Sequence, residues 1–515
     1  MAQIFDNFNT KWENFHRTVN QTVNQVTVIA NDRSDSYYDF YTDSLNQIKF
    51  LIGRAISTNR KIKVSGGKWS FTEIGFSEDF MITPTNLNKQ RRLQDNDLDA
   101  NCAFRSENLI ICQSGAKIKT ISRKLKRWNK SLDASGASNG QTIAGAIGTG
   151  THGSAIDFGS VQEMVQGLHI IVDGNRSVLL ERASQPITNQ SFQNNIDADI
   201  IRDDDMFNAA LVGLGSFGYL YGVILKVSDA FLLKKYVQPI NFSDLEKLLD
   251  NNLDFQSSNF EVAKEVGNTP YHFKVLVNPY KKDCLTEVMY KKPFDPNYKK
   301  IDRNSGNYYN PDLLSVIGKI TKLAPITTPA FIQALGSQVM PKENFDGEDG
   351  TLADHFWDTT TAGHTFSTAI GIPIDQSRLA INTLIELIEN NTNIPAILAL
   401  RFVKGTKALM GFTHFDRTCI LEIDGVRNSI IDDFIKKIPP AFKAKGIDFS
   451  FHWGKFNPLD AQMVKDIYKD RFELWKNKRS ELMNKSASDL YCSAYAQSLG
   501  LCAVGSSPAS IPVIT

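Results

Sequence analysis

A glycine-rich segment at 134–154 carries the residues best suited to hold a ligand. It contains six glycines among serines and threonines and almost no charge, the glycines being Gly136, Gly140, Gly145, Gly148, Gly150 and Gly153. So many glycines are costly in backbone entropy, so we expect neither an ordinary helix nor an ordinary strand there. A backbone without Cβ atoms can lie flush against a flat ligand and point its N–H groups at phosphates.

The alternative is a flexible glycine linker. Four apolar residues argue against it, because linkers avoid apolar side chains: Ile143, Ala144, Ala146 and Ile147. The composition therefore favours a cradle for a ligand.

A second block has the composition of a phosphate-binding turn. The predicted strand at 61–65 runs directly into Gly66-Gly67-Lys68-Trp69-Ser70-Phe71. A strand followed by paired glycines and hydroxyls can wrap a pyrophosphate with backbone N–H donors. A plain β-turn would need only one of those glycines.

Three blocks resemble those of a known family. They are Val64–Phe71, Ile143–Ser154 and the His-Trp-Gly-Lys sequence at 452–455, and they occur in that family's order and rough spacing. The chain thereby resembles the vanillyl-alcohol-oxidase superfamily, nearest to the branch of aldonolactone, alditol and related alcohol oxidases. The resemblance implies an α+β fold with a PCMH-type FAD-binding domain and an α+β substrate domain, whose antiparallel sheet is flanked by helices.

The chain is long enough for more than one domain, since 515 residues exceed what one core usually holds. We expect an FAD-binding domain at 1–235 and a substrate-binding domain at 236–440. The segment 441–485 is expected to return to the first domain, and the tail 486–515 has no assigned role.

The resemblance also implies which residues bind FAD. They are Val64, Ser65, Gly66, Gly67, Lys68, Trp69, Ser70, Gly136, Ala137, Thr142, Gly145, Thr149, Gly150, Thr151, His152, Val223, His452 and Lys455. Many family members carry, at the position of Trp69, a histidine bonded covalently to the flavin. Trp69 has no nitrogen suited to that bond, so the resemblance implies non-covalent FAD.

Three residues are candidates for catalysis. By resemblance, Lys455 lies at the reactive face of the flavin and Arg401 is the arginine of a substrate-facing Glu-x-Arg strand. Ala399 stands where the glutamate belongs, and Glu422 on a nearby predicted strand could supply the carboxylate or could be an exposed strand residue. His414 is a weaker candidate, because a lone histidine is more often structural.

Gly136 is the residue that bears on the identity of the electron acceptor. In the resembled family this position tends to be small in enzymes that react with O₂ and is alanine in some that react poorly. Removing a methyl group above the flavin would open a path for O₂, whereas the alternative is a plain turn glycine. We expect an FAD-linked oxidase acting on an alcohol or lactone CH–OH group; the alternatives are a dehydrogenase with another acceptor and a flavin-binding protein without turnover.

The sequence Gly213-Leu-Gly215-Ser-Phe-Gly218 matches the dinucleotide fingerprint G-x-G-x-x-G. That fingerprint requires a strand before it and a helix after it. Here a helix at 204–212 precedes it and a strand at 219–227 follows, so we expect no nicotinamide site.

Composition excludes several other classes. Net charge is +1, which gives no electrostatic case for nucleic acid or a membrane surface, and the basic residues at 117–130 predict the solvated face of a helix. No signal-peptide pattern and no long apolar run occur, so we expect a cytoplasmic protein that acts on a small molecule. The six cysteines lack metal-binding spacing, and Cys492 and Cys502 could pair.

The remaining segments must position these residues. We expect strands at 25–30, 109–112, 271–277 and 418–423, a hairpin at 168–180, and helices at 41–52, 378–389 and 468–483. The polar stretch at 88–107 is expected to be an inserted loop, and 283–350 a loop or lid.

Overall fold

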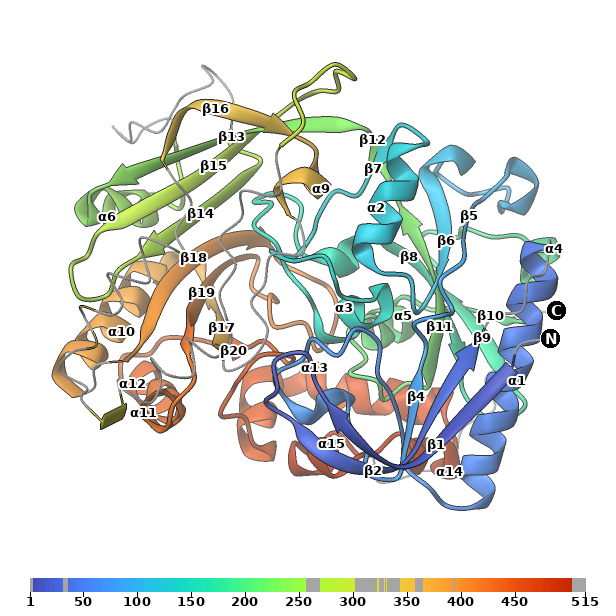
Figure 1. The fold of residues 1–515 in the computed structure, drawn as a ribbon. Helices are drawn as coiled ribbons and strands as arrows, with labels where there is room; N and C mark the ends of the chain where they lie inside the picture. The colour runs from blue at the N-terminus through green and yellow to red at the C-terminus, as the bar shows by residue number, and fades with distance from the viewer. Residues whose placement is uncertain are drawn as a thin grey trace.

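The computed structural model describes residues 3–30, 36–255, 269–301, 343–356, 365–391 and 394–502, together with 322, 323, 328 and 330. Three sheets dominate these residues, and the glycine-rich segment with helix α3 (Ile143–Thr149) lies between the largest sheet and the other two (Figure 1). Most of residues 302–342, the middle of the loop or lid predicted at 283–350, lie outside the described residues.

The first sheet is four-stranded, in the order β1 (Gln3–Glu13), β2 (Asn20–Ala30), β4 (Phe80–Thr83) and β3 (Ile62–Val64). β2 and β3 both run parallel to β4, and β1 pairs antiparallel with β2. Parallel strands need a crossover, which helix α1 (Tyr37–Ser57) provides between β2 and β3. This places the 64–71 block at the end of a buried strand.

The second sheet is six-stranded, in the order β10 (Asp199–Arg202), β9 (Ser177–Glu181), β8 (Val165–Ile171), β11 (Tyr219–Lys226), β6 (Leu109–Gln113) and β5 (Gln90–Arg92). The predicted hairpin is β8–β9, and every residue of β6, β8 and β9 is buried. The predicted loop at 88–107 contains the short strand β5.

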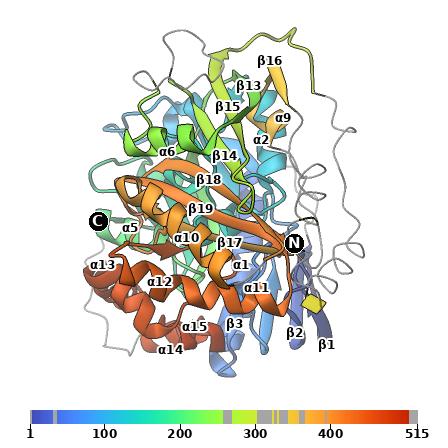
Figure 2. The same ribbon diagram turned by 90° about the vertical axis from the view of Figure 1, so that its left-hand side faces the viewer.

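The third sheet is eight-stranded and wholly antiparallel. Its order is β16 (Asn344–Gly350), β13 (Phe231–Ile240), β15 (Cys284–Pro293), β14 (His272–Val277), β18 (Ala396–Lys404), β19 (Arg417–Val426), β17 (Thr365–Pro373) and β20 (Ser450–Phe451). Helices α6 (Phe242–Asp250) and α10 (Ser377–Asn391) cover its apolar face, as Figure 2 shows. Because side chains alternate along a strand, the other face is free to carry polar residues.

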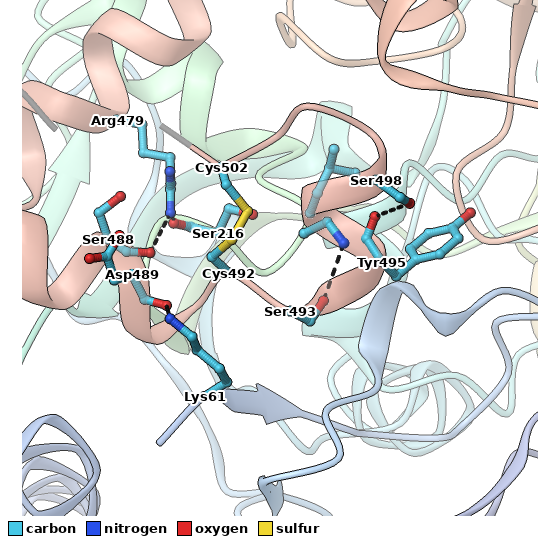
Figure 3. Close-up of a disulfide and its surroundings, with 12 residues drawn as sticks. Lys61, Ser216, Arg479, Ser488, Asp489, Cys492, Ser493, Tyr495, Ser498 and Cys502 are labelled. Carbon is cyan, nitrogen blue, oxygen red and sulfur yellow. Dashed lines mark hydrogen bonds between the residues drawn. A yellow bond between two sulfur atoms is a disulfide. The ribbon is translucent and has the colours of Figure 1, made fainter. Parts of the chain in front are cut away.

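The shorter elements complete the chain. They are α2 (Ile118–Lys126), β7 (Lys130–Ser131), α4 (Gln190–Asn195), α5 (Asp204–Leu211), β12 (Ser228–Asp229), α9 (Leu352–His355), α11 (Ser429–Phe434), α12 (Ile438–Ala444), α13 (Ala461–Leu482), α14 (Lys485–Leu490) and α15 (Ala494–Ser498). Helix α2 buries Ile118, Ile121 and Leu125 and leaves its basic residues exposed or half-buried. The solvated basic face expected at 117–130 does not include Lys130, which lies on β7, is 8% exposed and pairs with Asp229 at 2.7 Å. The described part of the tail contains α14 and α15, and a disulfide between Cys492 and Cys502 links the segments on either side of α15 (Figure 3).

Two sequence-based expectations are wrong. Residues 143–149 of the glycine-rich segment do form a short helix, because Ile143, Ala146 and Ile147 share one buried face and repay its entropy. Gly150 ends this helix in the left-handed conformation, at φ 73°. In addition, 284–293 and 344–350 are strands rather than parts of a loop.

Candidate functional site

The three sequence blocks meet at Gly454. A Cβ atom at Gly454 would lie 3.2 Å from Cε1 of His452, 3.3 Å from Oγ of Ser70 and 3.4 Å from Oγ1 of Thr149. The Phe71 N–H donates to the Gly454 carbonyl at 2.8 Å, which ties the first block to the third. Residues almost 400 positions apart in sequence thus form one site, and no local pattern requires this.

The glycines of the first two blocks pack against each other. A Cβ atom at Gly66 would lie 2.0 Å from Thr142 Oγ1, and one at Gly67 would lie 3.2 Å from the Gly140 carbonyl oxygen. Side chains at these positions would force the two backbones apart, so the close approach requires glycine.

Helix α3 presents an opposite, open face. A Cβ atom at Gly148 would have no atom within 4 Å, and one at Gly145 would meet only Thr142 Oγ1, at 3.1 Å. The apolar residues of the helix are buried in the core on its other side. A side-chain-free face beside a tightly packed glycine turn fits a flat, multi-ring cofactor with a diphosphate, which is what FAD is.

Trp69 lies in an aromatic cluster that the sequence did not indicate. Its ring stacks on Phe15 at a centroid distance of 4.4 Å and meets His16 edge-on at 5.7 Å. His16 itself stacks on Phe71 and is 1% exposed. The turn between β1 and β2 therefore supplies a histidine near Trp69, but packing on Phe71 buries it. Lys68 adopts a positive φ of 60° and directs its ammonium over Trp12.

Glu422 lies at the centre of a charged cluster. One of its carboxylate oxygens accepts from Nζ of Lys455, and the other accepts from Nε of Arg401. Glu422 is 2% exposed and Arg401 7%. Of the two readings of Glu422, the structure therefore excludes the exposed strand residue and brings all three catalytic candidates together.

The strand register explains how Glu422 reaches Arg401. Ala399 and Glu422 are direct partners on β18 and β19, so their side chains lie on the same face of the sheet. Arg401, two residues along β18, shares that face. The carboxylate absent from position 399 is thus present on the adjacent strand, directly opposite the alanine.

The charges around Glu422 set its protonation state. Burial would raise its pKa, but the charges of Arg401 and Lys455 outweigh burial and hold the pKa well below the usual value. Burial raises the pKa of Asp424, two residues along the same strand; the Glu422 charge adds to this, and Lys455 offsets it in part. Asp424 was not among the residues predicted from the sequence, although the alternating Glu-Ile-Asp pattern of β19 places it on the same face as Glu422.

Two buried histidines complete the cluster. Nδ1 of His152 lies 3.2 Å from the Gly153 carbonyl oxygen, so this nitrogen carries the proton, and Nε2 lies 3.7 Å from Oε1 of Glu422. Burial lowers the pKa of His152 to about 3, with the Lys455 and Arg401 charges contributing, so its Nε2 is an unprotonated acceptor at neutral pH. Nδ1 of His452 accepts from the Gly454 N–H at 3.0 Å, so its Nε2 is the protonated nitrogen.

The loop at 213–218 has the polarity opposite to that of a phosphate site. Its carbonyl oxygens accept from buried cations: Nζ of Lys63 lies 3.3 Å from the Gly215 oxygen, and Nε of Arg479 lies 2.7 Å from the Ser216 oxygen (Figure 3). A nucleotide-binding turn presents N–H donors instead. Helix α5 precedes the loop and β11 follows it, so the predicted order of elements is confirmed.

The remaining candidates lie outside the charged cluster. His414 bonds to the Gly411 carbonyl at 3.0 Å and packs on Tyr468. Val223 is buried on β11, whereas Ala137 is exposed in the glycine-rich segment. Within the described residues there is no group of three metal-ligating side chains, and no helix is long and apolar enough to cross a membrane.

Comparisons with known proteins agree with this geometry. Residues 39–177 match the family model described as FAD binding domain, and residues 223–487 match the model described as D-arabinono-1,4-lactone oxidase. An L-gulono-1,4-lactone dehydrogenase of Mycobacterium tuberculosis is 21% identical over 429 residues, which cover 82% of this chain and 87% of the relative. A D-arabinono-1,4-lactone oxidase of Candida glabrata is 23% identical over 212 residues, 41% of this chain and 36% of that relative.

A solved structure shares the fold. The cholesterol oxidase of Brevibacterium sterolicum superposes with a TM-score of 0.69 at 13% identity, covering 97% of each chain. The architecture is therefore the PCMH-type FAD-binding fold with an α+β substrate portion, as predicted.

Proposed function

The chain belongs to the D-arabinono-1,4-lactone oxidase family, and on this premise we propose that it oxidises a CH–OH group of a lactone or related polyol with O₂ as electron acceptor. FAD is the cofactor, and when bound it accepts the two electrons of the substrate as a hydride. The single observation that supports the proposal is the cluster of half-buried Lys455 with buried Glu422 and Arg401 beside the open glycine face.

The protein's part in this reaction is to bind the hydroxyl and place charge around it. Lys455 is the N–H donor for the hydroxyl oxygen, where negative charge grows as the proton leaves, and the nearby Arg401 contributes its positive charge. Glu422 balances one of the two cations, so the three side chains together carry one net positive charge. That charge stabilises the developing anion without leaving two buried cations unpaired.

Two acceptors compete for the hydroxyl proton. Oε1 of Glu422 and the unprotonated Nε2 of His152 lie 3.7 Å apart, so a hydroxyl between them can donate to either. We assign the proton to His152 Nε2, because Lys455 and Arg401 already engage both oxygens of Glu422. Replacing His152 by Gln should then reduce activity more than replacing His452 by Gln, because Nε2 of His452 is a donor and cannot accept the proton.

We expect the FAD to be bound non-covalently, because Trp69 has no suitable nitrogen and His16 is buried against Phe71. We expect purified protein to be yellow and to release all its FAD on acid precipitation. Flavin fluorescence that migrates with the denatured chain on a gel would contradict this.

The central experiment separates three candidate functions. Holoenzyme is mixed anaerobically with L-gulono-1,4-lactone or D-arabinono-1,4-lactone, flavin bleaching is followed, and air is then admitted. Bleaching with rapid recovery in air supports an oxidase, and bleaching with slow recovery supports the dehydrogenase alternative, which the name of the mycobacterial relative motivates. Normal photoreduction without bleaching by either lactone or by a polyol panel would indicate a flavin-binding protein without turnover.

The oxygen proposal is tested at Gly136. A methyl group there would lie 2.9 Å from Cγ2 of Thr151, so Gly136→Ala both adds bulk and displaces Thr151. The double variant Gly136→Ala with Thr151→Ser removes the contacting methyl group and isolates the first effect. If the double variant reoxidises in O₂ at the wild-type rate, Gly136 is a packing glycine and has no part in oxygen access.

A further inference from the structure

A row of charged side chains extends from the candidate active site along the polar face of the eight-stranded sheet. It runs from Glu422 on β19 to Arg401 on β18, Lys274 on β14 and Glu287 on β15. Arg401 and Lys274 are direct cross-strand partners, and so are Lys274 and Glu287. Their side chains therefore lie side by side on one face.

The order of charges in this row is unusual. Each cation has a carboxylate on its outer side: Arg401 bonds to Glu422, and Nζ of Lys274 lies 3.2 Å from Oε1 of Glu287. At the centre, Arg401 and Lys274 face each other, and like charges directly opposite one another are unfavourable. Among the described residues, no carboxylate lies within ion-pair distance of both.

The two cations also keep unused hydrogen-bond donors. Nη1 of Arg401 is buried and has no hydrogen-bond partner in the described part of the chain, although Arg401 is only 7% exposed. An unpaired buried donor is unfavourable and marks a place where a partner is expected. Lys274 has three ammonium donors, of which the Glu287 contact uses one.

The row is continuous with the reaction site. Arg401 belongs to both, and β14 begins at His272, which forms an isolated bridge with Ala155 just beyond His152. At the far end of the row, Oε1 of Glu287 lies 3.2 Å from Nζ of Lys274 and 3.3 Å from Nε2 of His272. A substrate group that binds Arg401 would therefore lie next to Lys274, the direct cross-strand partner of Arg401.

We propose that the adjacent Arg401 and Lys274 side chains bind a carboxylate at the non-reacting end of the substrate, so that the enzyme selects polyhydroxy acids over neutral polyols. The proposal rests on the proposed function, whose site it extends. A single negative charge fits best, because Glu287 and Glu422 flank the two cations and would repel a dianion. The charge-assisted bonds would restore the donors left unused by the chain.

Binding is tested first, without turnover. Propanoate has a carboxylate and no hydroxyl, so its affinity for oxidised holoenzyme can be measured by calorimetry. Lys274→Gln could leave Glu287 unpaired and disturb folding, so the double variant Lys274→Gln with Glu287→Gln is the main probe. We expect propanoate affinity to fall at least tenfold in the double variant and to be retained in Lys274→Arg.

The control is Lys292→Gln. Lys292 is on β15 of the same sheet but on the opposite face by alternation, and its ammonium pairs with Asp349 at 3.1 Å. Its substitution should leave propanoate affinity unchanged. Equal affinity in wild type and the Lys274/Glu287 double variant, or no binding to wild type, would overturn the proposal.

Selectivity is tested second, with D-gluconate and sorbitol, which differ by a carboxylate and a CH₂OH group. We expect the ratio of their kcat/KM values to fall at least tenfold in the double variant, mainly through KM for gluconate. If neither compound nor any lactone reduces the flavin while propanoate still binds through Lys274, the proposed function fails and the anion site stands. If lactones are oxidised but gluconate has no advantage over sorbitol in wild type, the anion site fails and the function stands.

Discussion

Two buried pairs of cations in this molecule have different partners. Lys455 and Arg401 meet a carboxylate, Glu422, at the edge of an open face, whereas Lys63 and Arg479 meet backbone carbonyl oxygens, those of the loop at 213–218 and, for Arg479, also that of Ser488. The first pair can redistribute its bonds when a substrate oxygen arrives. The second pair links segments of the chain: Arg479 donates to the Ser216 and Ser488 carbonyl oxygens, although its Nη1 has no hydrogen-bond partner among the described residues.

The comparison shows that a motif must be judged by the polarity of its hydrogen-bonding groups. The loop has the glycine spacing of a nucleotide site, yet its oxygens point at basic side chains. Gly218 has φ 116°, and a Cβ atom there would lie 2.6 Å from the Ile171 carbonyl oxygen, so packing accounts for this glycine. The charged cluster matches no complete sequence motif, yet the register of β18 against β19 brings Glu422 and Arg401 together. The following experiments test this contrast.

Lys455→Met should give the largest effect. One preorganised charge next to the reacting atoms contributes about 3–4 kcal/mol, so flavin reduction by substrate should slow by a factor of about 100 to 1,000. Anaerobic stopped-flow measures this step, and reoxidation by O₂ is measured separately on dithionite-reduced enzyme. Normal reduction would mean that the His-Trp-Gly-Lys block does not mark the active site.

Arg479→Met should affect stability instead. Arg479 is 1% exposed and donates to the Ser216 and Ser488 carbonyls at 2.7 and 2.8 Å, so its loss leaves two buried acceptors unpaired. We expect the free energy of unfolding to fall by about 2–4 kcal/mol, measured by denaturant titration, while the reduction rate of folded enzyme stays unchanged. The control is Lys476→Met on the exposed side of α13. A slowed reduction step in Arg479→Met would show that the two regions are coupled.

The lowered pKa of Lys63 predicts that the free energy of unfolding depends on pH. Burial, helped by the Arg479 charge, lowers its pKa to about 7 from 10.5, so between pH 7 and 10.5 the unfolded chain binds more protons than the folded one. The unfolding free energy contributed by Lys63 should therefore rise with pH across this window, by about 1 kcal/mol per unit. Lys63→Met should remove that slope, whereas Lys485→Met, at an exposed position, should keep it. Parallel slopes in wild type and Lys63→Met would mean that the pKa of Lys63 is the same in the folded and the unfolded chain.

The last prediction is that nicotinamide nucleotides have no effect on the enzyme. NAD and NADP should neither bind to the holoenzyme nor support flavin reduction, because the 213–218 loop offers acceptors where phosphate needs donors. Calorimetry with either nucleotide checks this, with FAD binding to apoenzyme as the positive control. Saturable micromolar binding would show that this loop is a ligand site.

Much of the fold could be predicted from the sequence because its signals are local. Alternation and turn residues located β8, β9, β14 and β19, and the helix before Gly213 and the strand after Gly218 are present as predicted. The short helix at 143–149 was missed, since the entropy argument from glycine spacing ignored the buried face formed by Ile143 and Ile147. The strands at 284–293 and 344–350 were missed because polar composition outweighed their pairing in the sheet.

The sequence by itself determined the three blocks, and through them the family, the FAD cradle and the candidates Lys455 and Arg401. Only the tertiary structure decided the role of position 422. Whether Glu422 faces Arg401 or solvent depends on the register of β18 against β19, and a shift of one residue would reverse it. The same register sets Arg401 opposite Lys274, a contact between strands more than 120 residues apart that no pattern within either strand encodes.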